Sequence, residues 1–248
     1  MRLTVPCALC ALAVTLTFLP PLHACRPLAL DDCPPVDKGR VSLESGITST
    51  RGSSSDGTIG ETTSIKYGIL SGVDVGIDLP YLLLKQTDGS YIQGLGDVTL
   101  KSKISVVDYL KSWAGLSFVA SSKLSNGDTE KGLGSGFNDY GVNVITTKAF
   151  GESLIHANIG YLITGDASLR NSWQYGCSCD YPAMNGIHLM GEIVGGTNPD
   201  AAAEGDLLST QVGIYKSIGG IIVDAGVNFG LSSANPANVY TMGVTFGF

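Results

Sequence analysis

The chain has little charge. Asp, Glu, Lys and Arg make up 15% of its 248 residues, against roughly 25% in soluble domains. Beyond the N-terminal stretch it has no apolar run of the roughly 20 residues that a transmembrane helix needs. Acidic residues outnumber basic ones by 22 to 15 and no basic patch occurs, so we expect no nucleic-acid partner. Few charges and 33 glycines instead suit short strands with one lipid-facing side.

Familiar catalytic motifs are also missing. No Gly-x-Ser-x-Gly elbow, Gly-Lys-Ser/Thr phosphate loop or His-Glu-x-x-His zinc motif occurs. His188 and Glu192 share one strand face, but four residues span roughly 13 Å along a strand, too far to share a metal without other ligands. We therefore expect no enzyme, no catalytic residues, no metal and no cofactor. An outer-membrane hydrolase that uses His156 with a Ser and an Asp or Asn from neighbouring strands is kept as an alternative.

The first 24 residues indicate an export signal, with a membrane anchor as the alternative. Arg2 supplies the positive start, an apolar region interrupted by prolines follows, and Ala24 is a small residue at a plausible cleavage point. Export would place the mature chain in an oxidising compartment.

Four of the six cysteines lie after this signal. Cys25 has two possible fates: lipidation, because the residues before it loosely resemble a lipobox, or a short disulfide loop with Cys33. Cys177 and Cys179 alternate on one strand face. This spacing favours two small apolar side chains over a bridge, because residues i and i+2 lie roughly 6.6 Å apart along a strand.

Apolar residues recur with period two along the mature chain, and no segment keeps a helical period. In 73–80, for example, Val73, Val75 and Ile77 alternate with Asp74 and Gly76. The pattern predicts twelve strands, at about 40–50, 61–70, 73–83, 96–107, 113–123, 138–148, 153–164, 171–181, 186–195, 207–216, 220–230 and 239–248.

The connections between these segments alternate between short turns and mostly longer loops rich in Gly, Ser, Asn and Asp. This is the layout of an outer-membrane barrel, and an even strand count places both chain ends on the short-turn side. In lipid every backbone polar group must be paired, so the first and last strands should close the sheet. We predict an all-β fold: a closed antiparallel transmembrane β-barrel of about twelve strands with up-and-down topology, over residues 39–248. A soluble β-sandwich is the alternative, but its outward faces would need more charge.

The last strand carries the clearest lipid-facing pattern. Its large apolar residues share one face and small or polar residues occupy the other. An ending of this kind resembles the C-terminal assembly signal of bacterial outer-membrane barrels, which implies the barrel-assembly machinery as a partner. The residues of this face are Tyr240, Met242, Val244, Phe246 and Phe248.

The start of the mature chain carries a family resemblance. Arg26-Pro27-Leu28, the pair Asp31-Asp32, Lys38-Gly39 and Glu44 are similar to the opening of proteins in the MetA-pathway phenol-degradation family, a group regarded as outer-membrane transporters. Shorter echoes occur at Leu95 to Lys101 and Gly191 to Gly195. Cys25 and Cys33 depart from the pattern, standing where small residues are expected. The resemblance implies a barrel transporter more firmly than it implies phenol as the solute.

If the apolar face meets lipid, the polar face lines the lumen. We expect residues 25–38 to form a short periplasmic segment before the barrel. Luminal charges could form either a selective constriction or a structural ion-pair network. The candidates are Glu44, Lys66, Asp74, Asp78, Asp97, Lys101, Lys103, His156, His188, Glu192 and Asp224.

These observations together predict an outer-membrane channel for passive passage of small molecules, possibly hydrophobic or aromatic ones. The expected partners are outer-membrane lipid, the assembly machinery and a small-molecule solute. The alternative from another class is a closed barrel with a binding or structural role. An interior without a continuous water path would distinguish it.

Overall fold

The structure is a computed structural model that describes residues 26–51, 58–86, 88–234 and 238–248. The expected export signal, residues 1–24, and Cys25 lie outside these residues. The described chain is all β, without a helix that could cross a bilayer. Its strands are β1 (Val41–Arg51), β2 (Ile59–Leu70), β3 (Val73–Lys85), β4 (Tyr91–Leu95), β5 (Thr99–Val107), β6 (Gly115–Lys123), β7 (Asp139–Phe150), β8 (Ser153–Ile163), β9 (Ser172–Pro182), β10 (Ile187–Gly196), β11 (Leu207–Ile218), β12 (Ile221–Gly230) and β13 (Asn238–Gly247).

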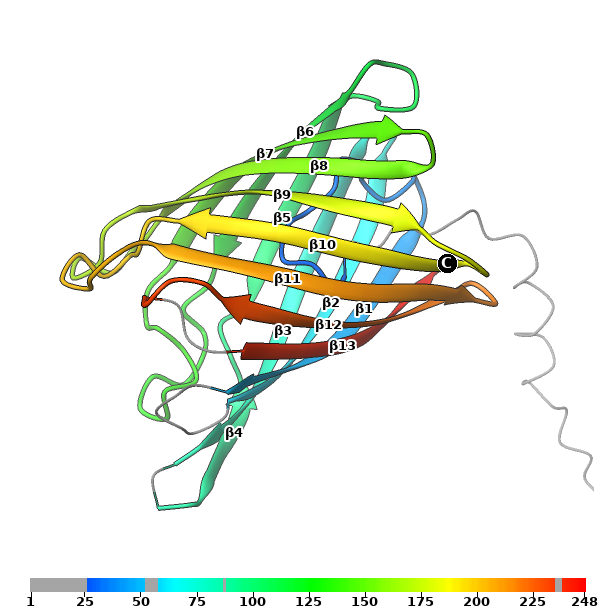
Figure 1. Cartoon of the computed structure of the whole chain (residues 1–248). Helices are drawn as coiled ribbons and strands as arrows, with labels where there is room; N and C mark the ends of the chain where they lie inside the picture. The colour runs from blue at the N-terminus through cyan, green and yellow to red at the C-terminus, as the bar shows by residue number, and fades with distance from the viewer. Residues whose placement is uncertain (1–25, 52–57, 87, 235–237) are drawn as a thin grey trace, which may run out of the picture.

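One antiparallel sheet closes on itself to form the barrel in Figure 1. β1 pairs with β2 on one side and with β13 on the other, and β13 is followed in order by β12 down to β5, then β3 and back to β2. The seam continues past the strands, because Val41 and Phe248 exchange both backbone hydrogen bonds, at 3.1 and 2.9 Å. Twelve of the described strands form this ring, which confirms the predicted fold class.

The short strand β4 is the element that the sequence analysis missed. It pairs with the distal part of β3, over Tyr81 to Lys85, whereas β5 pairs with the proximal part, over Val73 to Asp78. β3 and β4 therefore form a hairpin that continues one wall beyond the ring (Figure 1). The pattern predicted a loop here because five residues are too few to reveal a period.

Alternation along each strand separates two environments. Apolar side chains such as Ile193, Val212 and Met242 face outward and are 48%, 54% and 61% exposed. Inward positions carry the buried polar residues, among them Ser117, Thr147 and Thr245. The C-terminal face behaves as expected, since Tyr240, Met242 and Phe248 are exposed. An apolar outer surface around a polar interior is what a bilayer-spanning barrel requires.

Short and long connections alternate as predicted. Two-residue turns join β2 to β3, β7 to β8 and β11 to β12, and glycines at positive φ occupy them, such as Gly72 at 81° and Gly151 at 63°. Only glycine adopts this backbone conformation without strain. The longer connections, such as 124–138 and 197–206, lie at the opposite end of the barrel. Because β1 leads into a long connection and β13 follows one, the start of β1 and the end of β13 both lie on the short-turn side.

A charge placed on the outer face should destabilise the barrel in lipid. Val212 faces outward near the middle of β11, and Arg at the bilayer midplane costs about 2–4 kcal/mol. We expect Val212→Arg to lower the free energy of unfolding from lipid bilayers by that amount, measured by denaturant titration of heat-modifiable gel mobility. Leu169→Arg, in the loop between β8 and β9, is the matched control and should have little effect. Equal stability of the two variants would contradict a lipid-facing β11.

Candidate functional site: the barrel interior

The chain segment before β1 lies inside the barrel. Residues 26–38, here called the lumen segment, contact inward side chains of the wall, and Figure 1 shows the segment in dark blue between the strands. The sequence analysis instead expected a separate periplasmic segment. The physical reason for the difference is that the wall presents buried polar groups which need partners, and the backbone of the lumen segment supplies them.

The lumen segment follows the wall in strand order. Arg26 bonds to β12 and β13, Pro27 to β11, and Ala29 and Leu30 to β10. Further along, Asp31 bonds to β8, Cys33 to β6 and β7, and Val36 to β3. Lys38 then forms a parallel bridge with Gly68 of β2 before β1 begins. The segment therefore runs around the interior and narrows the lumen along most of the wall.

Inward glycines make room for the start of this path. Gly46 and Gly243 are cross-strand partners on β1 and β13, and Gly213 and Gly226 are partners on β11 and β12. The guanidinium of Arg26 lies over the first pair and the ring of Pro27 over the second, so close that a Cβ at Gly46 or Gly213 would overlap them. These glycines form a trough in the wall that accepts the lumen segment.

Carboxylates of the wall hold the segment through its backbone. Both oxygens of Glu192 accept backbone N–H groups, from Ala29 at 2.9 Å and from Leu30 at 3.0 Å. Asp74 accepts the N–H of Val36 at 2.8 Å. Hydrogen bonds to an ionised acceptor are roughly twice as strong as neutral ones. Glu192 and Asp74 were both predicted to face the lumen; their role as backbone acceptors was not predicted.

Lys103 ties the acidic pair of the segment to β5. Its Nζ lies 2.7 Å from Asp31 Oδ1 and 3.1 Å from Asp32 Oδ1, and it donates to the Asp32 carbonyl at 2.9 Å. Burial by itself would raise the pKa of Asp31, but the nearby Lys103, Lys66 and Lys101 outweigh it and hold that pKa well below its usual range. The Asp31 carboxylate is thus kept charged beside the Lys103 ammonium.

The centre of the segment is the most deeply buried part. Leu30 and Cys33 are 4% and 1% exposed. The Cys33 N–H donates to Thr147 Oγ1 at 3.1 Å, and its carbonyl accepts from Ser117 Oγ at 2.6 Å. Cys33 is a free thiol among the described residues, and Cys25, the other half of the expected disulfide loop, lies outside them. Cys177 and Cys179 are also free and face outward, as their spacing suggested.

His156 is a structural member of this buried group. Its Nδ1 lies 2.8 Å from Thr147 Oγ1, which also accepts the N–H of Cys33. His156 is 6% exposed and Thr147 is fully buried, so neither could meet a substrate while the segment is in place.

Other predicted luminal residues pair with each other beside the segment. Lys66 bonds to Glu44 at 2.7 Å, and Lys101 pairs with Asp78. His188 Nδ1 lies 2.7 Å from Asp180, whose second oxygen accepts the hydroxyl of Tyr215 at 2.8 Å. Asp224 pairs with Arg26 of the segment at 3.4 Å. Within the described residues no cluster of His, Cys, Asp and Glu is arranged to hold a metal.

Asp97 is placed differently from the sequence expectation. It lies between β4 and β5, at the long-loop end, and accepts backbone N–H groups from Gly127 and Ser135 of the β6–β7 loop. These bonds lower the pKa of Asp97 despite the opposing effect of burial. Its hydrogen bonds fix this loop. The pattern predicted a strand that starts at residue 96 and would include Asp97, whereas β5 starts only at Thr99.

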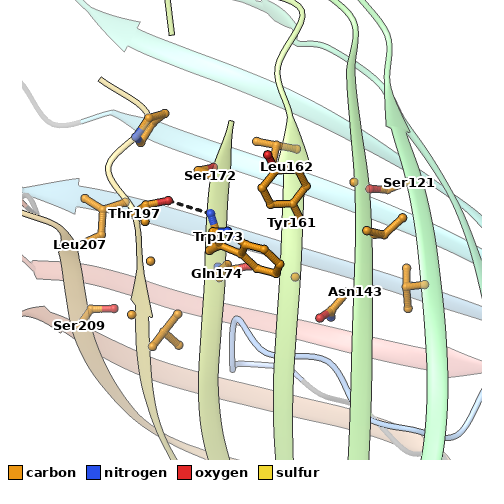
Figure 2. A pocket seen from close by; sticks show the side chains of 18 residues that line it. Ser121, Asn143, Tyr161, Leu162, Ser172, Trp173, Gln174, Thr197, Leu207 and Ser209 are labelled. Carbon is orange, nitrogen blue, oxygen red and sulfur yellow. Dashed lines mark hydrogen bonds between the residues drawn. The ribbon is translucent and has the colours of Figure 1, made fainter. Parts of the chain in front are cut away.

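A cavity of about 420 Å³ lies on the long-loop side of the lumen segment. On β8 and β10, which run toward the long loops, a lining residue comes two positions after one that touches the segment: Gly160 follows Asn158, and Val194 follows Glu192. On β11, which runs the other way, the lining residue Ser209 precedes Gln211. Figure 2 shows hydroxyl and amide side chains around it, from Ser121, Asn143, Ser172, Gln174, Thr197 and Ser209. The interior therefore has two levels along the barrel axis. The level toward the short turns carries charged side chains and is filled by the segment, and the level toward the long loops is hollow.

Comparison with solved structures identifies the same architecture. An outer membrane channel from Pseudomonas putida F1 superposes with a TM-score of 0.71 over 89% of this chain and 100% of that chain, at 12% identity. The KdgM porin gives a TM-score of 0.60 over 84% of this chain and 99% of its own, at 9% identity. Comparisons with family models and with curated proteins return no match. These likenesses show the fold, an outer-membrane type of β-barrel.

The lumen segment was the main functional element that sequence reasoning missed. The signal for it is the set of glycines at inward positions, Gly46, Gly213, Gly226 and Gly243, together with the Asp31–Asp32 pair. Glycine at an inward position marks close approach of another backbone.

Filling the glycine trough should displace the lumen segment. In Gly213→Val the new side chain would occupy the place of the Pro27 ring. We expect maleimide to label Cys33 about tenfold faster than in the parent, which corresponds to a loss of about 1.4 kcal/mol in the free energy of seating. The measurement uses a background in which serine replaces every other cysteine.

The control is Gly191→Val on β10, where a Cβ would meet no atom nearer than 3.9 Å. It should leave the labelling rate of Cys33 unchanged. An equally slow rate in folded Gly213→Val would show that the trough does not hold the segment.

Proposed function

We propose that this protein is an outer-membrane channel through which small molecules pass passively, with the lumen segment as its constriction. The observation that carries the proposal is the polar interior with its two levels, a cavity toward the long loops and a hydrogen-bonded segment toward the short turns. The apolar outer face supports a place in lipid, and the likeness to barrel channels supports the same architecture. The MetA-type resemblance and the aromatic or hydrophobic solute that it implies belong to this proposal.

Movement of the lumen segment would set the rate of passage. Most of its bonds go to side chains of the wall, and its one backbone bridge to the sheet is at Lys38 among the described residues. Arg26 and Cys33 add side-chain bonds to the carbonyls of Met242 and Ile145. The barrel can therefore stay closed while single contacts break. The luminal carboxylates contribute in two ways: Asp74, Glu192 and Asp224 bind the segment, whereas Glu44 and Asp78 neutralise lysines of the wall.

The proposal includes the remaining expectations for this chain. The N-terminal residues would act as an export signal, Cys25 would be a lipidation candidate, and the outward face of β13 would be recognised by the barrel-assembly machinery. The hydrolase alternative loses support because His156 is 6% exposed and its Nδ1 lies against Thr147, which holds the lumen segment. A closed barrel with a binding or structural role is the second candidate, and the number of wall contacts made by the segment favours it.

Solute flux into proteoliposomes tests the proposal. The wild type should admit small sugars and small aromatic solutes slowly. Asp74→Ala should increase the flux several-fold, because it removes the acceptor of the Val36 N–H. Asp78→Ala is the matched control: it leaves every contact of the segment intact and frees Lys101, so it should alter charge preference more than rate. No flux of any solute through folded protein of all three forms would favour the closed barrel.

A further inference from the structure

We propose that the outer face of β1, β2 and β3 is a binding site for a phosphorylated lipid whose acyl chains are amide-linked and hydroxylated. The site goes beyond the channel function, because it lies on the lipid side of the wall. Two observations carry it: a carboxyl group at an outward position of β2, and two basic side chains nearer the long loops on β1 and β3.

Glu61 of β2 points to the lipid side of the wall. Its cross-strand partners are Ile47 of β1 and Tyr81 of β3, which are outward side chains with 48% and 41% exposure. Directly opposite residues share one face of a sheet. Within the described strands Glu61 is the one acidic residue at an outward position. An ionisable side chain on the lipid face is costly and indicates a functional site.

The protein satisfies only one oxygen of this carboxyl group. The hydroxyls of Ser45 and Thr63, which also face outward, donate to Glu61 Oε1 at 2.8 and 2.7 Å. Oε2 accepts no hydrogen bond from the described residues, and it is not buried. An acceptor in hydrocarbon without a donor is costly. The molecule that lies against Glu61 in the membrane should therefore offer an N–H or O–H group.

Two basic side chains lie on the same face, nearer the long loops. Ser49 of β1 and Leu83 of β3 both lie opposite Ile59 of β2. Arg51 and Lys85 come two residues further along these strands, so they are about 10 Å apart, two strand spacings. Both are exposed, and neither pairs with a carboxylate of the described residues. The long loops are extracellular in such barrels, so these two side chains mark the headgroup level of the outer leaflet.

The spacing between these groups matches one class of lipid. Ile47 and Tyr81, the partners of Glu61, each precede the basic residue of their strand by four positions. This is roughly 13 Å along the strand and about 10 Å in depth at a tilt near 40°.

A lipid that places phosphate at the basic pair would bring the first atoms of its chains toward Glu61. Phosphate oxygens suit the guanidinium of Arg51 and the ammonium of Lys85. Amide N–H and hydroxyl groups at the start of the chains are the donors that Oε2 lacks. Glycerophospholipids with ester-linked chains have no donor at this depth. The geometry therefore favours a phosphorylated lipid with amide-linked hydroxyacyl chains.

A second copy of the chain fits the carboxyl group less well. Copies related by rotation about the membrane normal present each residue at a single depth. Lys148 and Lys216, the other outward basic residues of the described strands, lie near the short-turn ends of β7 and β11. Arg51 and Lys85 lie at the opposite, long-loop ends. Among the described strands no outward cation is therefore available at the depth of Glu61.

Native mass spectrometry of the full barrel in detergent micelles tests the site. The probes are diphosphoryl lipid A, which has phosphates and amide-linked hydroxyacyl chains, and phosphatidylglycerol, which has a phosphate and ester-linked chains. We expect saturable binding of lipid A, about tenfold tighter than that of phosphatidylglycerol, because only lipid A offers donors to Glu61. Equal binding of the two lipids would overturn the inference, and this comparison needs no variant.

Three variants locate the site, each checked for folding by heat-modifiable gel mobility. Glu61→Leu should weaken the binding of lipid A about tenfold and leave phosphatidylglycerol unchanged, because it removes the acceptor alone. Arg51→Met/Lys85→Met should weaken both lipids about tenfold, because the phosphate loses two cations. Lys216→Met, an outward basic residue at the short-turn end, is the control and should bind both lipids as the parent does.

Two further results would refute the role of Glu61. Lipid A binding that is unchanged or tighter in folded Glu61→Leu would show that the carboxyl group accepts nothing from the lipid. A wild-type dimer that dissociates in Glu61→Leu would instead assign the carboxyl group to a contact between copies.

Discussion

Closure of the sheet between β1 and β13 is the constraint on which the rest of this structure depends. Ten residue pairs join the two strands, from Ser42–Gly247 to Arg51–Asn238. Without this seam two bare edges would face lipid, where unpaired backbone groups are very costly. Closure also creates an interior that is shut off laterally. Inward side chains can then find partners only from one another, from water or from the chain's own N-terminal residues.

The lumen segment supplies partners of this kind to the inward side chains of the wall. Glu192 and Asp74 project from opposite parts of the wall, and each takes backbone N–H groups of the segment. Lys103 then balances Asp31 and Asp32. A wall that carries both signs of charge at one level, and glycines where the segment must pass, is matched to this occupant. On the long-loop side of the segment the interior is left hollow, and no charged side chain lines that cavity.

The wall could be predicted from the sequence because it rests on a local rule. Period two in segments such as Val73 to Leu79 fixes which side chains face lipid, and the C-terminal face from Tyr240 to Phe248 follows the same rule. The lumen segment depends on contacts between residues more than a hundred positions apart, such as Leu30 with Glu192, and it has no period. Asp97 was assigned wrongly for a different reason. The predicted strand started three residues too early, so the prediction placed Asp97 in the lumen instead of in the connection before β5.

Single-channel conductance in planar bilayers tests most directly the central claim that the lumen segment constricts a conducting barrel. The measurement compares the wild type with Lys103→Met, which leaves Asp31 and Asp32 without their shared cation. Lys148→Met is the control, since Lys148 lies on the outer face over the ring of Trp113. The account predicts small currents in the wild type and the control, and a several-fold larger conductance in Lys103→Met. Equal conductance in all three folded proteins would contradict it.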